Sequence, residues 1–146
     1  MKKLLILWIG IIFCLCLYSQ NILFSSATEY MEIKNGVLQY RVTTYTYSNP
    51  VSSVPTGSDT RVIFSQYLLK GKTLKRLKTI IRRSNFYSLP AECGASPKER
   101  HYPESLMIEW KGRKHKVSFR SHPEYPAPYG YEKIKSEIFN EIDRIK

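Results

Sequence analysis

Apolar and polar positions alternate through much of the first half of the 146-residue chain, a pattern typical of β-strands. Tyr30–Lys34 and Val37–Tyr47 flank Asn35-Gly36, the dipeptide that best accepts the positive φ angles of a type I′ turn. A β-hairpin is therefore predicted here. Residues 48–60 are rich in serine and proline and have no hydrophobic period, which predicts a loop. A third strand is expected at Arg61–Leu69.

The pattern then changes to a helical period. Thr73 is the predicted N-cap of a helix that ends near Asn85, before Pro90 stops it. The apolar positions of this helix form one stripe that must face a core, namely Leu74, Leu77, Ile80 and Ile81.

The last third of the chain predicts a second hairpin and a second helix. Leu106–Trp110 alternates, Gly112 supplies a turn, and His115, Val117 and Phe119 alternate again. The closing helix carries apolar residues at helical spacing, at Ile134, Ile138, Ile142 and Ile145.

These elements predict an α+β fold in the order β-β-β-α-β-β-α. Because the strands come as hairpins, we expect an antiparallel sheet of about five strands, with both helices packed on one face. The opposite face of the sheet is then left to solvent or to a partner.

The first 27 residues have the order of a secretory signal. Lys2 and Lys3 precede an apolar run, Leu4–Leu17, and Ser25-Ser26-Ala27 offers small residues for a signal peptidase. The run of about 14 residues is shorter than the roughly 18 expected of a spanning helix. We therefore expect a signal peptide at 1–27, a single α+β domain at 28–146, and export by a bacterium to the periplasm or the medium.

An uncleaved anchor is the alternative interpretation of this start. Tyr18, Ile22, Leu23 and Phe24 lengthen the apolar segment enough to span a thin bilayer. The protein is then an anchored accessory subunit of an envelope complex.

The chain is strongly basic, with 23 Lys and Arg against 12 Asp and Glu and a formal net charge of +11. Residues 1–27 contain two lysines and no acidic residue, so the remainder carries +9. In an exported protein this charge favours an envelope protein with an acidic face, an anionic polymer or a membrane surface, and it disfavours nucleic acid. The alternative explanation of the high net charge is that it keeps the protein in solution.

Basic residues are concentrated on the first predicted helix, which has no acidic residue. They are Lys75, Arg76, Lys78, Arg82 and Arg83. Lys114 and Lys116 extend this surface if the outer face of the sheet is near. A solvated helix face is the alternative. The second candidate is formed by two Tyr-Pro segments, Tyr102-Pro103 and the connector at 122–131 with Tyr125, Tyr129 and Tyr131, which either recognise a partner or close one end of the core.

No sequence motif predicts a catalytic centre, a metal site or a cofactor. A small hydrolase is the alternative function, with a site assembled from His101, His122, Glu104 and Glu124. Cys93 has no activating cation beside it and is expected to be an inert loop residue.

From Leu74 through Phe86-Tyr87-Ser88-Leu89-Pro90 into the second hairpin and the last helix, the chain resembles small exported bacterial domains of unknown function. The resemblance implies the fold and assigns no activity. The leading hypothesis is a non-catalytic exported binding module that uses the basic helix face or the Tyr-Pro loops.

Overall fold

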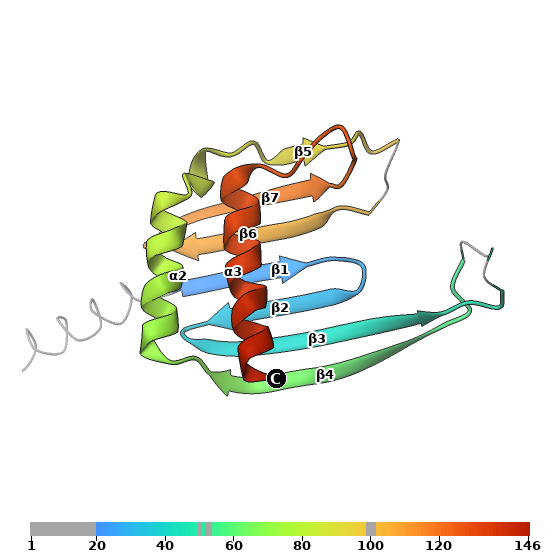
Figure 1. Cartoon of the computed structure of the whole chain (residues 1–146), viewed down its shortest axis with the longest axis horizontal. Coiled ribbons are helices and arrows are strands. Elements are labelled where there is room, and N and C mark those ends of the chain that lie inside the picture. The colour runs from blue at the N-terminus through green and yellow to red at the C-terminus, as the bar shows by residue number, and fades with distance from the viewer. Residues whose placement is uncertain (1–19, 50, 52–53, 99–101) are drawn as a thin grey trace, which may run out of the picture.

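The computed structural model describes residues 20–49, 51, 54–98 and 102–146. These residues form one sheet of seven strands in the order β4-β3-β2-β1-β6-β7-β5, and both helices cover the same face of it (Figure 1). The strands are β1 (Gln20–Ser25), β2 (Glu29–Lys34), β3 (Val37–Thr46), β4 (Gly57–Leu68), β5 (Glu92–Gly94), β6 (Glu104–Trp110) and β7 (Arg113–Arg120), and the helices are α2 (Gly71–Arg83) and α3 (Tyr129–Ile145). The predicted α+β class is confirmed.

The sheet differs in detail from the expected five or so antiparallel strands, because β1 and β5 add to it. Strand β5 pairs parallel to β7 through Cys93 and Phe119, so the sheet is mixed, and all other pairs are antiparallel. Three residues that include Gly94 give no detectable alternation, which is why β5 is absent from the sequence pattern.

Strand β1 lies at the centre of the sheet. It pairs with β2 through Ile22 and Ile33 and with β6 through Ile22 and Ile108. Ile22 and Phe24 are buried in the core. The folded sheet therefore begins at Gln20, eight residues before the expected domain boundary at 28, and the predicted cleavage point after Ala27 lies in the β1–β2 turn.

The β3–β4 hairpin is longer than predicted. Strand β4 begins at Gly57, inside the expected 48–60 loop, and pairs with Thr46. The far ends of β3 and β4 project beyond the other strands as an arm (Figure 1).

Helix α2 begins at Gly71, so the expected capping role of Thr73 is wrong. Lys70 occupies the N-cap position with no side-chain cap bond, and Thr73 is buried inside the first turn. The Thr73 hydroxyl donates a hydrogen bond of 2.7 Å to Glu141 of α3. The end of the helix follows the prediction, because Asn85 adopts the left-handed conformation at φ 55°.

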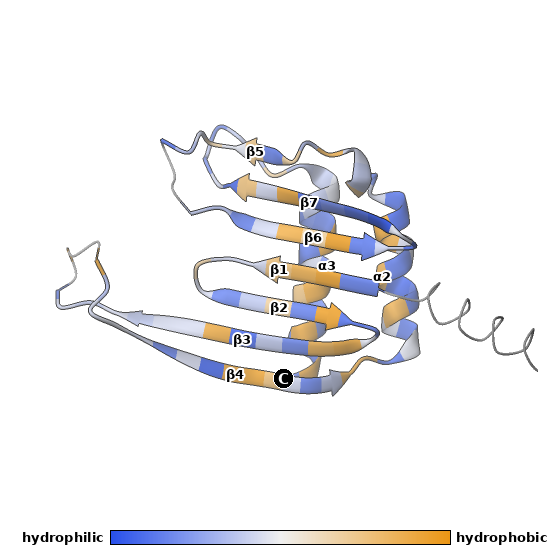
Figure 2. Cartoon of the chain, turned by 180° about the vertical axis from the view of Figure 1, so that it is seen from behind, coloured by the Kyte–Doolittle hydropathy of each residue, from blue (hydrophilic) through white to orange (hydrophobic). Residues whose placement is uncertain are grey.

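One core lies between the sheet and the two helices. The predicted stripe of α3 faces it, with Ile134, Ile138 and Ile142 almost completely buried. Neither of the described helices covers the opposite face of the sheet (Figure 2). Among the described helices, neither is long and apolar enough to cross a membrane.

Candidate functional site

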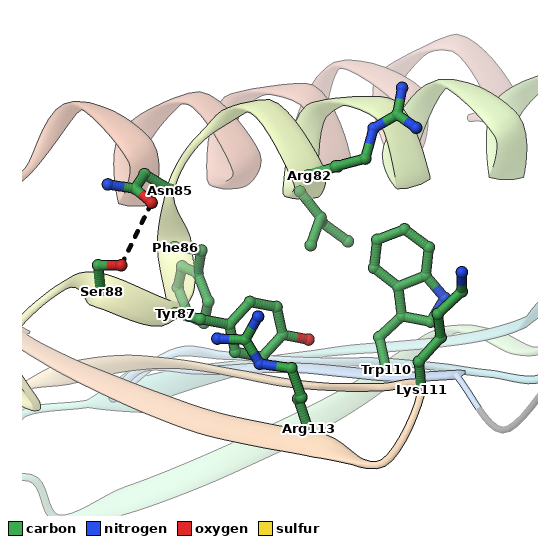
Figure 3. A pocket seen from close by; sticks show the side chains of 9 residues that line it. Arg82, Asn85, Phe86, Tyr87, Ser88, Trp110, Lys111 and Arg113 are labelled. Carbon is green, nitrogen blue, oxygen red and sulfur yellow. Dashed lines mark hydrogen bonds between the residues drawn. The ribbon is translucent and has the colours of Figure 1, made fainter.

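A cleft of about 270 Å³ opens between the end of α2 and the tip of the β6–β7 hairpin (Figure 3). Lys111 and Gly112 form the tip with φ angles of 52° and 74°, which is the geometry of a type I′ turn. Trp110 and Arg113 pair across the hairpin just below the tip, on the helix side. The cleft is lined by Ile81, Arg82, Asn85, Phe86, Tyr87, Ser88, Trp110, Lys111 and Arg113.

Three cations line the cleft and no carboxylate does. Arg82 comes from the last turn of α2, while Lys111 and Arg113 come from the hairpin. All three are exposed, and within the described part of the chain none of them makes an ion pair. Unpaired guanidinium and ammonium groups around one hollow favour an anionic ligand.

Aromatic rings form the walls between these cations. The Arg113 guanidinium carbon lies 4.3 Å from the centroid of the Tyr87 ring, and Lys111 Nζ lies 5.7 Å from that of Trp110. Cation–π contacts of this kind fix the long side chains in place without neutralising them. Two of the three cationic groups are therefore partly pre-positioned.

Tyr87 contributes a polar atom that has no partner among the described residues. Its hydroxyl oxygen is buried, and it points toward the Trp110 side of the cleft (Figure 3). Burial raises the pKa of Tyr87, the Arg113 guanidinium lowers it and the Glu109 carboxylate raises it, so that the pKa lies above its ordinary value. The hydroxyl therefore stays protonated at neutral pH and can donate a hydrogen bond to a bound anion.

The predicted basic helix face is divided by the structure. Arg76 forms ion pairs with Glu137 and Glu141 and so links α2 to α3. Lys75 is exposed and Lys78 is half-buried. Arg82 and Arg83 lie at the end of the helix, where Arg82 lines the cleft with its guanidinium directed away from Trp110 and Arg113 (Figure 3).

Lys114 and Lys116 do not extend the helix surface. His115, Val117 and Phe119 face the helices, so the two lysines between them face the open side of the sheet. There Lys114 lies opposite Glu109 in the β6–β7 ladder, and Lys116 lies opposite Met107.

The three predicted binding tyrosines have different environments. Tyr131 is completely buried and belongs to the core. Tyr125 is 47% exposed and packs against His122 with 5.2 Å between ring centroids. Tyr129 is 73% exposed and accepts a hydrogen bond of 2.9 Å from Lys133.

Tyr129 and Arg83, two residues from different predicted sets, line a second hollow. It measures about 280 Å³ and lies where the end of α2 meets the start of α3. Lys133 is a second cation there, and no carboxylate lines it. The structure thus gathers basic residues on both sides of the α2 C-terminus.

The residues proposed for a hydrolase are not brought together in the described part of the chain. His101 lies outside the described residues. His122 accepts a hydrogen bond from the Glu124 backbone amide, while Glu104 binds Tyr131 and Lys135. Across residues 20–49, 51, 54–98 and 102–146, no cluster of three His, Cys, Asp or Glu side chains is placed to hold a metal ion.

Cys93 and His115 occupy strands. Cys93 lies in β5 instead of the expected loop, and burial raises the pKa of its thiol. His115 is half-buried, bonded to the Leu89 carbonyl at 2.9 Å and packed against Phe86, as its position in the alternating pattern predicts.

Sequence reasoning missed Tyr87, Trp110, Lys111 and Arg113 as site residues. Trp110 was placed at the end of an alternating strand and Tyr87 in the segment that ends the first helix, while Lys111 and Arg113 were not singled out. A sequence signal does exist, since Trp110-Lys111-Gly112-Arg113 places two cations beside a large aromatic residue at a hairpin tip. No protein-family model and no curated protein matches the sequence.

Proposed function

We propose that the protein is an exported, non-catalytic binding module that recognises an anionic partner through the cleft between α2 and the β6–β7 hairpin. The observation that carries this proposal is the set of three cations, Arg82, Lys111 and Arg113, around one hollow that no carboxylate lines. Phosphate or carboxylate groups match the donors of guanidinium and ammonium groups.

The surroundings of the cleft support the same proposal. The aromatic walls provide apolar contact area beside the charges, as binding surfaces require. The second hollow, with Arg83 and Lys133, continues the positive surface across the end of α2. An extended acidic chain or an anionic surface therefore fits better than a single small ion.

The proposal is tested with a soluble polyanion. The full chain, purified in a neutral detergent, is titrated with polyphosphate, and binding is measured by calorimetry at several salt concentrations. Each basic residue near an anionic surface contributes about 1 kcal/mol, so the triple variant R82A/K111A/R113A is expected to bind about 100-fold more weakly and with a smaller salt dependence.

The matched control removes the same charge elsewhere. Lys98, Lys114 and Lys116 are exposed and lie outside both hollows. The change in binding of the variant K98A/K114A/K116A therefore reports only the general effect of net charge. Equal weakening in the two triple variants contradicts a cleft-based site.

A further inference from the structure

Strand β4 forms one edge of the sheet in the described part of the chain. It spans Gly57–Leu68, and only one of its sides pairs with a described strand. In such an antiparallel edge strand, every second residue directs its backbone N–H and C=O groups outward, where a further strand can bind them. The opposite edge, β5, has three residues, so β4 is the edge that is long enough to accept a partner strand.

Strand β4 lacks the features that usually protect a sheet edge. Natural edge strands are often very short or carry lysine or proline, whereas β4 has 12 residues and contains neither. The register shifts in its pairing lie on either side of Tyr40, so Gly57–Val62 forms an unbroken ladder with Arg41–Thr46 of β3. This ladder is the arm that projects beyond both helices (Figure 1), and its β4 side is exposed throughout.

Exposed apolar side chains gather on β4 and at the tip of the arm. Within the described part of the chain, eight large hydrophobic residues are exposed, and five of them lie here, namely Tyr47, Val51, Val54, Val62 and Leu68. Val62 is 54% exposed although it sits in the middle of the strand. A strand added beside β4 would cover part of this apolar surface and bind the outward backbone groups at the same time.

The region around β4 is electrically balanced, unlike the chain as a whole. Residues 42–69 contain one acidic and one basic residue, Asp59 and Arg61, whereas the full sequence has a formal net charge of +11. Both side chains are exposed, and neither forms an ion pair within the described residues. Two copies of this edge can therefore approach each other with little of the repulsion that the basic surfaces would cause.

We infer that the β4 edge pairs with the β4 edge of a second copy of this chain, in an antiparallel ladder whose two-fold axis passes through Thr60. A two-fold ladder between identical strands is centred on a residue, because only then do outward backbone groups meet outward groups. A centre at Asp59 or at Arg61 would place like charges opposite each other. The centre at Thr60 places Asp59 of each copy opposite Arg61 of the other, and opposite charges in such pairs are stabilising.

This arrangement joins the two sheets edge to edge. The axis is perpendicular to the sheet, so the helices of both copies cover the same face of the combined sheet. Because the ladder runs along the arm, α2 and α3 do not lie between the pairing strands (Figure 1). The anion-binding cleft is formed by α2 and the β6–β7 hairpin, with β3, β2 and β1 between it and this edge. The inference therefore does not depend on the proposed function.

The first test is a disulfide at the two-fold axis. The full chain, with C14S, C16S and C93S to remove its own thiols, carries T60C and is mildly oxidised in a neutral detergent. Because residue 60 of one copy lies directly opposite residue 60 of the other, we expect T60C to form a disulfide-linked dimer, measured by mass under non-reducing conditions.

Matched controls move the thiol by two positions on the same face of the strand. In S58C or V62C alone, the two thiols lie about 13 Å apart along the ladder, too far for a disulfide. An equal mixture of S58C and V62C should give the mixed dimer, because these positions lie opposite each other. No crosslink in T60C, or equal crosslinking of S58C with itself, overturns the inference. A disulfide between T60C and a different protein, recovered after oxidation in cells, assigns the edge to a foreign strand and overturns it as well.

The second test exchanges the charges beside the axis. D59R places guanidinium groups opposite each other twice in each dimer, so its dissociation constant in sedimentation equilibrium should rise about 10-fold. The double variant D59R/R61D restores opposite charges in the reverse order and should regain the dissociation constant of the parent. E124R makes the same change of charge at an exposed position outside β4 and should leave it unchanged. Equal weakening by D59R and E124R, or no recovery in the double variant, overturns the inference.

Discussion

Tyr131 shows at the residue scale why an aromatic, proline-rich connector is not by itself a binding loop. Its hydroxyl donates a hydrogen bond of 3.1 Å to Glu104, whose two oxygens also accept hydrogen bonds of 2.8 Å from Lys135. Burial first, and then the Glu104 carboxylate, raises the pKa of Tyr131 far above its ordinary value. The tyrosine therefore fastens the start of α3 to β6.

Loss of this hydroxyl is expected to cost stability. Y131F leaves Glu104 without one buried donor, so the free energy of unfolding in urea should fall by about 1–2 kcal/mol. Y125F removes a hydroxyl from an exposed ring and should change it by less than about 0.5 kcal/mol. Equal values for the two variants would show that the Tyr131–Glu104 bond contributes nothing measurable.

The contact between α2 and α3 depends at the element scale on close packing at one end and on charge at the other. At Gly130, an added Cβ would lie 2.2 Å from the Ser84 carbonyl oxygen. Further along, Arg76 and Thr73 of α2 both bind Glu141 of α3. Glycine at position 130 is therefore required by the approach of the two helices.

Two glycines in the first turns of the helices provide a matched pair of variants. G130A should lower the free energy of unfolding by about 1–3 kcal/mol, because backbone cannot move aside for the methyl group. G71A meets no atom within 4 Å and should raise stability by up to about 1 kcal/mol through helix propensity. Thermal unfolding of both variants checks this, and a neutral G130A would contradict the close approach.

Acid should loosen the same contact. Burial raises the pKa of Glu141, but hydrogen bonds from Thr73 and Arg144 and the charges of Arg76 and Arg144 outweigh it, so the pKa is lowered below 4.5. A carboxyl with a lowered folded-state pKa stabilises the fold above its unfolded pKa, and this contribution is lost as the pH falls from about 4.5 through the folded pKa.

The pH dependence is measured as the free energy of unfolding between neutral pH and about pH 3. E141Q should be less stable than the parent at neutral pH and should lose less stability on acidification. E124Q, at an exposed position, should follow the parent curve. Parallel curves for parent and E141Q would exclude Glu141 as the source.

The sequence pattern predicted those elements that are buried on one side and are long enough for their hydrophobic period to repeat. The β2–β3 and β6–β7 hairpins and the stripes of both helices have these properties. Strand β1 was hidden because Ile22-Leu23-Phe24 follows a long apolar run, so its alternation reads as an extension of that run. Strand β5 is too short for an alternating pattern to repeat. The role of Thr73 was missed because its partner Glu141 lies 68 positions away in the sequence.

The candidate cleft was only partly predictable for a related reason. Arg82 was found as part of a charged helix face, but its partners Lys111 and Arg113 are placed by strand pairing. Lys114 and Lys116 were grouped with the helix on charge alone, and the pleat of β7 turns them to the opposite face. The position of a charge relative to a sheet therefore needs the register, which the sequence pattern left open.

At the scale of the whole molecule, stability depends on the strand that the signal-peptide interpretation would remove. Deletion of residues 1–27 takes away β1, with the buried Ile22 and Phe24 and both of its ladders. Burial of two large apolar side chains contributes about 3–6 kcal/mol, a large part of the 5–15 kcal/mol typical of a domain. The truncated chain is expected to lack a cooperative unfolding transition and a native near-ultraviolet circular dichroism spectrum. Deletion of residues 1–19 keeps β1 and should preserve both. If the shorter chain, 28–146, unfolds as cooperatively as 20–146, then β1 is dispensable to the fold.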